Sequence, residues 1–359
     1  MKDENFKTVR TEQMGNGFFG YAALRLRRED VVRTLTDKVL GLGTKIFYDH
    51  QFDQIIQDGP DEVRFCFKNG VEASSTFLVG ADGIWSTVRS KAFPDWPKPV
   101  YTGQVGIVWN VPRLSLEEWV RGFDYEFHFS ASLISMSTTH YGATSFTRDD
   151  KENKYICTTS FRQLSGRSQD EWAAFFEDRN AIIKALRNEG GEPIPEPVNS
   201  SIEYAAANPD VNIFIWPMLM LDTSKHMVSQ DGKGRTILIG DAAHGFPPTG
   251  GQGANMAVED AETLALVLEN SGTDWTLQEA SGVWENWRMN RLARVRNYME
   301  EMRKYKFQKN QDKGSEGPKE AVSKDSAGQW EKLAWLHGYN AKEDMIEWIR
   351  AGQSSKLLE

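Results

Sequence analysis

The residue types best suited to chemistry lie in one run in the second half of the chain, ILIGDAAHGFPPTGGQGANMAVEDA over 237–261. Its apolar start predicts a buried strand that ends at Gly240, so that Asp241 stands at the carboxyl end of that strand. An aspartate there can accept hydrogen bonds from a sugar-like hydroxyl. A helix is expected from about Ala254, and the open amides and positive dipole end of its first turn favour a polar or anionic group.

Three glycines in this run would let a flat ligand approach the backbone closely, because Gly250, Gly251 and Gly253 carry no side chain. A glycine-rich loop followed by a capped helix, with no ligand, is the alternative interpretation. The glycines alone leave both interpretations open. The strand, the Gly-Asp pair, the prolines and the helix in a single run favour a binding site.

A second candidate motif is LVGADGIWSTVR over 78–89, which begins within a short buried strand expected over 77–79. Asp82 and Gly83 follow that strand, and Ser86 and Arg89 come soon after. Taken alone, the segment is better explained as an Asp-Gly turn with Ser86 capping the next helix. Its presence in the same chain as the first motif favours a binding role instead.

Together the two motifs resemble those of the FAD-dependent aromatic monooxygenases, the flavoprotein family of salicylate hydroxylase and para-hydroxybenzoate hydroxylase. In that family the aspartate of the first motif binds the ribityl chain of FAD, the glycine-rich helix start faces the isoalloxazine ring, and a proline lies beside the reacting ring. The second motif contributes to flavin and pyridine-nucleotide binding, and an arginine on an earlier helix contacts the FAD phosphates. The resemblance implies cofactor-binding roles for Arg28, Asp82, Gly83, Ser86, Arg89, Asp241, Gly251, Gln252, Gly253, Ala254 and Asn255, with Pro247 and Pro248 near the reacting ring.

The amino-terminal part of the chain contains two weaker features. Arg28 opens a helix expected over 24–40, where a solvated arginine is as good an interpretation as a phosphate ligand. The run GNGFFG over 15–20 matches the GxGxxG dinucleotide fingerprint by letter, but no convincing buried strand precedes it. We interpret it as a loop, and we expect the amino-terminal GxGxxG βαβ unit of the family to be missing from this chain.

The resemblance implies a reaction in which FAD carries the chemistry. NAD(P)H reduces the flavin, oxygen adds at its C4a position, and the resulting hydroperoxide hydroxylates or epoxidises an aromatic or polyketide-like small molecule, as in secondary metabolite biosynthesis. No protein nucleophile or metal is expected, and no catalytic base is chosen, since His128, His140 and Tyr141 are candidates by location only. The alternative is a flavin-free, redox-silent relative that acts as a cyclase, isomerase or binding protein, or an inactive truncated homologue.

The elements that would position these residues alternate between helix and strand. Val31, Val32 and Leu35 share one face of the first helix, and Val63, Phe65 and Phe67 alternate as in a strand. Helices are expected over 24–40, 170–188, 255–268 and about 282–305, strands over 63–67, 77–79 and 236–239, a tight turn at Asn69-Gly70, and a polar linker over 309–328. The last of these helices has an apolar side that we interpret as buried, formed by Trp284 and Trp287 with Val283, Leu292, Val295 and Tyr298.

The order of these elements predicts the fold class. Strands and helices alternate at both ends of the chain, around a middle with the two-residue alternation of antiparallel strands, most clearly over 123–129. We therefore expect an α/β (α+β) fold, the FAD/NAD(P)-binding Rossmann-like fold of the aromatic hydroxylase type, truncated at the N-terminus and with an inserted antiparallel sheet. The predicted domains are an incomplete FAD-binding domain over 1–100 and 228–300, a substrate-binding β-sheet domain over 101–227, and a C-terminal linker with helices over 301–359.

Composition excludes several classes of protein. The net charge of −9 over 359 residues argues against nucleic acid or an anionic membrane surface as the main partner. Two cysteines cannot form a disulfide framework and favour a cytoplasmic location, and no apolar run is long enough to span a bilayer. The six scattered histidines do not predict a zinc site. The expected partners are a small-molecule substrate and molecular oxygen, and the oligomeric state is left open.

Overall fold

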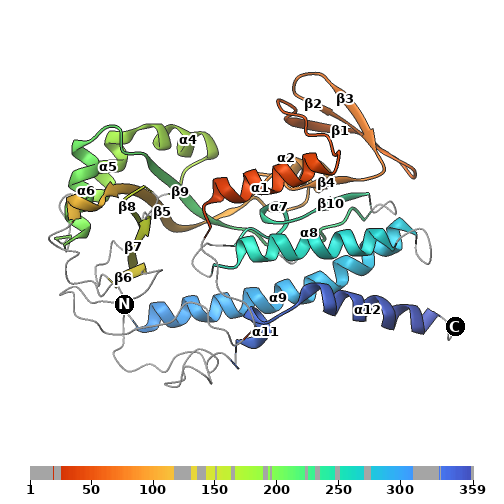
Figure 1. Cartoon of the computed structure of the whole chain (residues 1–359). Helices are drawn as coiled ribbons and strands as arrows, with labels where there is room; N and C mark the ends of the chain where they lie inside the picture. The colour runs from red at the N-terminus through yellow and green to blue at the C-terminus, as the bar shows by residue number, and fades with distance from the viewer. Residues whose placement is uncertain are drawn as a thin grey trace. The chain divides into compact units, whose positions relative to one another are not determined.

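The computed structural model describes residues 19, 26–116, 131–135, 143–149, 152–162, 166–188, 193–194, 196–222, 225–230, 235–246, 251–270, 276–309, 331 and 333–356. These residues divide into two compact units (Figure 1). The first unit lies within Tyr101–Leu219, and the second within Met14–Val100 and Met220–Glu359. The domain boundaries drawn from the sequence stay predictions.

The second unit contains an antiparallel sheet whose alternation the sequence predicts. Val63 and Phe65 are buried, and the hairpin turns at Gly70, whose φ of 82° is one that glycine adopts readily. The expected hairpin is therefore confirmed. In sheet order, the strands are β1 (Phe52–Asp58), β2 (Val63–Phe67) and β3 (Glu72–Ser75).

A pair of parallel strands in the same unit positions both sequence motifs. These are β4 (Leu78–Gly80) and β10 (Thr236–Leu238), with Leu238 opposite Gly80. Because the strands are parallel, their carboxyl ends lie at the same edge. Both strands are predicted by the sequence, but the burial expected for the first is wrong at Val79, which is 38% exposed. The strands lead into the short helices α2 (Thr87–Ala92) and α7 (Asp241–His244).

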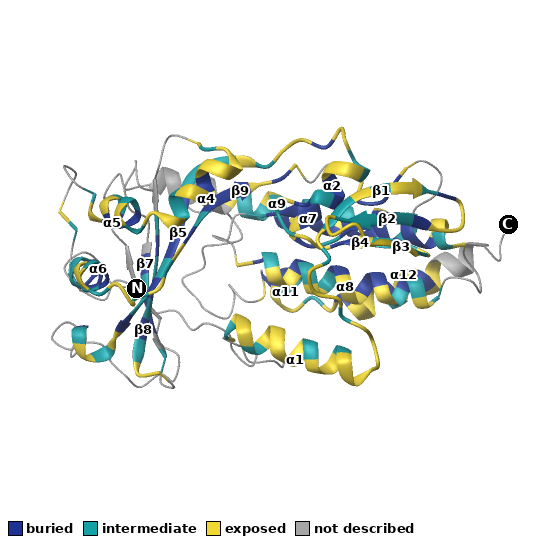
Figure 2. Cartoon of the chain, turned by 90° about the horizontal axis from the view of Figure 1, so that it is seen from above, coloured by how far each residue is buried: buried dark blue, intermediate teal, exposed yellow. Residues whose placement is uncertain are grey.

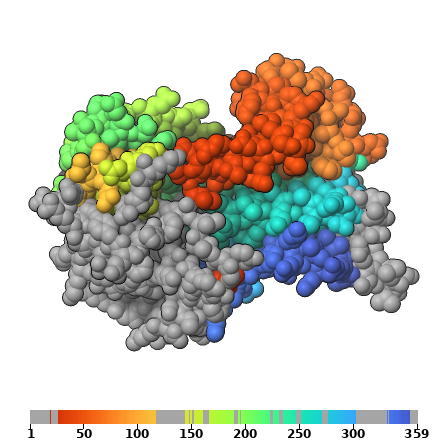
Figure 3. All heavy atoms as spheres, viewed as in Figure 1, coloured from red at the N-terminus to blue at the C-terminus, as the bar shows by residue number. Residues whose placement is uncertain are grey.

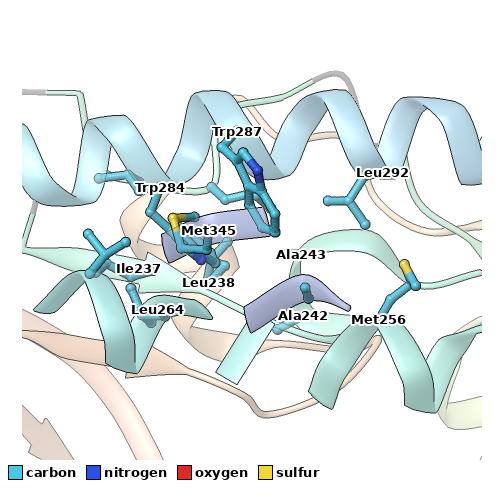
Figure 4. Packing of buried hydrophobic residues seen from close by; sticks show 14 of the residues in the cluster. Ile237, Leu238, Ala242, Ala243, Met256, Leu264, Trp284, Trp287, Leu292 and Met345 are labelled. Atoms are coloured by element: carbon cyan, nitrogen blue, oxygen red, sulfur yellow. The ribbon is translucent and has the colours of Figure 1, made fainter. Parts of the chain in front are cut away.

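The core of the second unit forms where this strand pair meets a group of helices. Trp284 and Trp287 of α9 pack in one cluster with Ile237 and Leu238 of β10 (Figure 4). Their spacing along the chain predicts this buried face, which the structure confirms. The helices α9 and α12 both pack against α8. The bounds are α8 (Gly253–Glu269), α9 (Leu277–Lys309), α11 (Ala334–His337) and α12 (Ala341–Lys356).

The first long helix of the second unit, α1 (Arg28–Gly41), has no buried residue. Val32 and Leu35 are 64% and 58% exposed, although the sequence gives them a common apolar face. Figure 2 shows the helix largely in the colour of exposed residues, and Figure 3 shows it at the surface. The helix is thus confirmed, while the described residues leave its apolar face uncovered.

The first unit is a five-stranded sheet with helices packed on one face. Val105, Ile107 and Trp109 are fully buried against those helices. The single helix expected over 170–188 is divided at Asp178, whose side chain accepts a hydrogen bond from the Ala181 amide and starts a new helix. In sheet order, the strands are β6 (Ala131–Ser135), β7 (Ala143–Asp149), β8 (Lys154–Arg162), β5 (Val100–Pro112) and β9 (Ile213–Met220), and the helices are η2 (Arg113–Leu116), α4 (Gln169–Glu177), α5 (Arg179–Arg187) and α6 (Val198–Ala207).

The other face of this sheet carries an indole and polar side chains. Gly106 alternates with the buried residues of β5, and a Cβ at this position would lie 2.4 Å from the ring of Trp216. Glycine here therefore lets the indole lie directly against the strand. Thr158 and Ser160 of β8 pair with Val108 and Gly106 and share that face. The aromatic alternation expected over 123–129 lies outside the described residues, as does 310–328 of the expected polar linker.

Candidate functional site

Asp241 stands at the end of β10, close to where the sequence predicts it. Gly240, with a φ of 58°, is the cap of α7, and Asp241 is the first residue of that helix. The short helix was not predicted. Asp241 is exposed, and among the described residues its carboxylate accepts no hydrogen bond. It is therefore free to accept hydrogen bonds from a ligand.

The start of α8 faces this carboxylate. The helix begins at Gly253, and a Cβ at this position would lie 3.8 Å from Asp241 Oδ1. Gln252 is the N-cap residue of the helix, and its side chain makes no capping hydrogen bond. The side chain of Gln252 therefore leaves the first-turn amides open. Gly251 has a φ of 65°, in the region that favours glycine. The structure thus brings together the carboxylate, the glycines and the open helix start that the sequence singles out.

Asp82 follows the neighbouring strand, but its carboxylate serves its own helix. It accepts hydrogen bonds from the Ser86 hydroxyl and from the amides of Thr87 and Val88, the last two at 2.7 and 3.1 Å. Ser86 Oγ in turn accepts from the Arg89 amide at 2.9 Å. Locally, the turn-and-cap interpretation of this motif is therefore correct.

Arg89 joins the two motifs from a buried position. Its guanidinium donates to the carbonyl oxygen of Ala242 at 2.7 Å and to that of Ile84 at 2.6 Å. Burial lowers the pKa of Arg89, and the nearby charge of Asp82 opposes that shift. The loops also touch directly, since a Cβ at Gly245 would lie 2.1 Å from Ile84 Cδ1. The carboxyl ends of β4 and β10 are thus held as one assembly.

A buried charge network beneath this assembly was not predicted. Asp260 of α8 accepts from His244 Nε2 and from Arg288 Nε, each at 2.5 Å, and all three side chains are fully buried. Glu259 extends the network, because it pairs with Arg288 at 2.6 Å and with Arg291 at 3.0 Å. The network connects α7, α8 and α9.

Opposing effects act on the carboxyl of Asp260. Burial alone would raise its pKa, but the interactions with His244 and Arg288 outweigh burial and hold the pKa below its ordinary value. A sequence signal for this network exists on α9. Arg288 and Arg291 share a helical face with Trp284, Leu292 and Val295, and arginines on an apolar face require buried acidic partners.

Several expected site residues are not connected to this assembly. Arg28 is exposed on α1, and no described contact links it to the residues above. Pro247, Pro248 and Gly250 lie outside the described residues, as do His128, His140 and Tyr141. Of the run over 15–20, only Phe19 is described. Their roles stay predictions.

Three further properties concern metal sites, membrane spans and cysteines, the first two within the described residues alone. They contain no cluster of three or more histidine, cysteine, aspartate or glutamate side chains that could hold a metal ion. No helix among them combines the length and apolar composition needed to cross a bilayer. Cys66 and Cys157 are unpaired, and burial raises the pKa of the Cys157 thiol.

Comparison with known proteins identifies the family. A family model described as FAD binding domain matches residues 20–282, which is most of the chain and includes both motifs. The chain belongs to the FAD binding domain family. The resemblance noted in the sequence is thereby confirmed at the level of the family.

Curated relatives of this FAD binding domain protein are named as monooxygenases and hydroxylases. The chain is 28% identical over 253 residues to the aurachin C monooxygenase/isomerase of Stigmatella aurantiaca, covering 68% of this chain and 54% of the relative. It is 25% identical to the FAD-dependent monooxygenase adaC of Aspergillus niger, covering 62% and 54%. It is 27% identical to 3-hydroxybenzoate 6-hydroxylase 2 of Aquipseudomonas alcaligenes, covering 67% and 66%. The match thus spans about half the length of the first two relatives.

Solved structures show the fold of this family member. CtdE in complex with FAD and a substrate superposes with a TM-score of 0.74 at 19% identity, covering 98% of this chain and 80% of CtdE. Klebsiella pneumoniae HpxO complexed with FAD and uric acid gives a TM-score of 0.56 at 20% identity, covering 90% and 70%. The predicted mixed α/β fold of the aromatic hydroxylase type is confirmed.

Proposed function

We propose that this chain is a FAD-dependent monooxygenase that consumes NAD(P)H and transfers one atom of molecular oxygen to an aromatic or polyketide-like small molecule. Family membership and the names of the monooxygenase and hydroxylase relatives support this proposal. The unpaired cysteines support a reducing, cytoplasmic location.

The observation that carries the proposal is the free carboxylate of Asp241 beside the open start of α8. A flavin fits these groups, because a ribityl chain offers hydroxyl donors and the carboxylate is an acceptor without a described partner. The first-turn amides of Gly253, Ala254 and Asn255 can hold a polar edge of the ring, and the helix dipole favours negative charge there. Gly251, Gly253 and the backbone of Gln252 leave room for a flat ring.

The other predicted cofactor residues have less direct roles in this proposal. Asp82, Gly83 and Arg89 shape the strand end beside the flavin, since the side chains of Asp82 and Arg89 are engaged within the protein. We assign the FAD phosphates to Arg28, and the edge of the reacting ring to Pro247 and Pro248. These assignments rest on the resemblance of the motifs.

When bound, FAD would supply the redox chemistry, accepting hydride from NAD(P)H and activating oxygen at its C4a position. The residues of the chain bind and orient the flavin and the substrate. We assign the substrate to the face of the five-stranded sheet opposite its helices. There Thr158 and Ser160 offer hydroxyl groups and Trp216 offers a flat apolar surface, a combination that suits a substituted aromatic ring.

The visible spectrum of the purified protein tests the proposal first. The protein is incubated with FAD, excess flavin is removed, and the retained absorption band is compared between the wild type and Asp241→Asn. Retention by the wild type and loss in the variant are expected. Oxidation of NAD(P)H and uptake of oxygen are then followed with a panel of phenols.

A colourless wild-type protein that is folded by circular dichroism would contradict the proposal. The flavin-free cyclase, isomerase or binding protein would then be the better interpretation. Retained flavin with NAD(P)H oxidation that no phenol stimulates would contradict the substrate class alone.

A further inference from the structure

Asp260 holds both ends of the helical turn that carries Asp241. Its Oδ2 accepts a hydrogen bond from the Gly240 amide at 2.7 Å and another from His244 Nε2 at 2.5 Å. Gly240 directly precedes α7, and His244 is its last residue. One carboxylate oxygen therefore connects the start and the end of the turn on which Asp241 lies.

The other oxygen of the same carboxylate accepts a hydrogen bond from Arg288, whose guanidinium also makes further hydrogen bonds. Arg288 Nε donates to Asp260 Oδ1 at 2.5 Å, its NH1 to Glu259 at 2.6 Å and its NH2 to the Met256 carbonyl at 3.0 Å. An ionised aspartate without this cation would be strongly disfavoured in a fully buried position. His244 and the Arg288 guanidinium together favour the ionised form of Asp260, and the contacts of the guanidinium fix the orientation of the carboxylate.

The geometry excludes direct contact of these side chains with a ligand. Asp260, His244 and Arg288 each have a relative exposure of 0%, whereas Asp241 is exposed. Because an ionised carboxylate only accepts, His244 Nε2 carries the proton in that hydrogen bond. The ring of His244 also packs on Phe246, with centroids 5.4 Å apart. The function of this cluster is therefore to hold the turn.

We propose that Asp260, oriented by Arg288, is the positioning residue that holds Asp241 in its ligand-binding geometry. The inference rests on the proposed function, because it concerns how the flavin carboxylate is presented. Asp260 acts through Gly240 and His244. It makes no contact with the flavin itself.

The decisive variant is Asp260→Asn, which keeps the shape of the side chain but removes its charge and one acceptor oxygen. The flavin dissociation constant is expected to increase by roughly 10- to 100-fold, the loss of one to two charge-assisted hydrogen bonds. Hydrogen–deuterium exchange of the segment 240–246, measured without flavin, is expected to accelerate, while exchange in the hairpin of β2 and β3 stays unchanged. Glu262→Gln, an exposed position on the same helix, is the matched control.

A core variant distinguishes a specific effect on flavin binding from a general loss of stability. Val267→Ala, also on α8 and fully buried, is expected to lower the melting temperature without changing flavin affinity. Arg288→Lys is a second test if Asp260→Asn does not fold, because lysine keeps the charge but cannot reproduce the forked contacts. It is expected to weaken flavin binding less than Asp260→Asn.

The outcomes are distinct. A folded Asp260→Asn protein with unchanged flavin affinity, or with unchanged exchange over 240–246, overturns the inference. So does an equal loss of affinity in Val267→Ala. If the wild type binds no flavin, the proposed function fails, and exchange over 240–246 alone decides whether Asp260 positions this turn.

Discussion

Two aspartates follow neighbouring parallel strands at the same edge, and they have opposite environments. Asp82 follows β4 and accepts three hydrogen bonds from the start of α2. Asp241 follows β10, and within the described residues its carboxylate accepts none. Both are exposed, so burial does not separate them. The difference is that Asp82 precedes α2 and accepts hydrogen bonds from its first amides, whereas Asp241 is itself the first residue of α7.

This comparison shows how a carboxylate at the end of a strand is left without a partner in the described residues. In the segment after β10, the structural work is done by a different residue, Asp260, which reaches the turn from α8. Arg89 secures the same turn from the other side through the Ala242 carbonyl. Because buried groups hold the turn, the Asp241 carboxylate is not needed to stabilise it. After β4, the amides at the start of α2 and any ligand would compete for the Asp82 carboxylate.

Breaking the link between the two segments should have the largest effect. Arg89→Met is expected to lower the free energy of unfolding by about 2–4 kcal/mol, because the buried Ala242 carbonyl and the partly buried Ile84 carbonyl lose a charged donor. Urea denaturation followed by circular dichroism measures this change. Arg64→Met is the control, since that arginine pairs with Glu72 near the surface and should matter by about 0.5 kcal/mol or less. Equal effects in both variants would refute the link.

Removing the free carboxylate should act on binding alone. Asp241→Asn is expected to weaken flavin binding by about 1.5–3 kcal/mol, roughly 10- to 100-fold, as lost hydrogen bonds to a charged group do. Because the residue is exposed and has no described partner, the free energy of unfolding should change by about 0.5 kcal/mol or less. Flavin titration by fluorescence and urea denaturation give the two values. A variant that loses stability instead would place Asp241 in the same class as Asp82.

The opposite pattern is expected for Asp82→Ala. Loss of the hydrogen bonds at the start of α2 should lower the free energy of unfolding by about 1–2 kcal/mol, the usual effect of removing a helix cap. Flavin affinity should fall by less than in Asp241→Asn. The same two measurements apply, with Ser90→Ala as a control near the surface of α2. A larger loss of affinity than of stability would show that Asp82 contacts the flavin directly.

The smallest expected change is in how stability depends on pH under acid conditions. The pKa of Asp260 is lowered in the folded protein, so its contribution to stability is present above about pH 4 and is lost as the pH falls through the folded value. Asp260→Asn should therefore reduce the dependence of stability on pH below about 4. Thermal melting between pH 3 and 7 would show this. An unchanged acid limb would mean that Asp260 is not ionised in the folded state.

Much of the local geometry of the candidate site was predictable because its residues are close in sequence. The strand, Asp241, the glycines and the start of α8 lie within 237–261, and local rules for strands, glycines and helix starts apply within such a run. The same holds for the hairpin of β2 and β3 and for the buried face of α9. The resemblance to a flavoprotein family also rests on these local motifs.

The features that the sequence analysis predicted wrongly or missed share a physical cause. Whether Val32 and Leu35 of α1 are covered depends on which elements pack beside them, and a helical period cannot state that. Asp178 divides the helix expected over 170–188 because its side chain caps a new start. The partners of Asp260 lie 16 and 28 positions away, so no local pattern connects them.

The sequence by itself determined which groups are available: an aspartate after a strand, glycines before a helix, and the family to which these motifs belong. Only the tertiary structure decided how each aspartate is used. Pairing of β4 with β10 brings both acids to one edge, and packing of α9 on α8 delivers Arg288 to Asp260. Hydrogen bonds and charges act over a few ångströms, so the roles of these side chains depend on neighbours that the fold supplies.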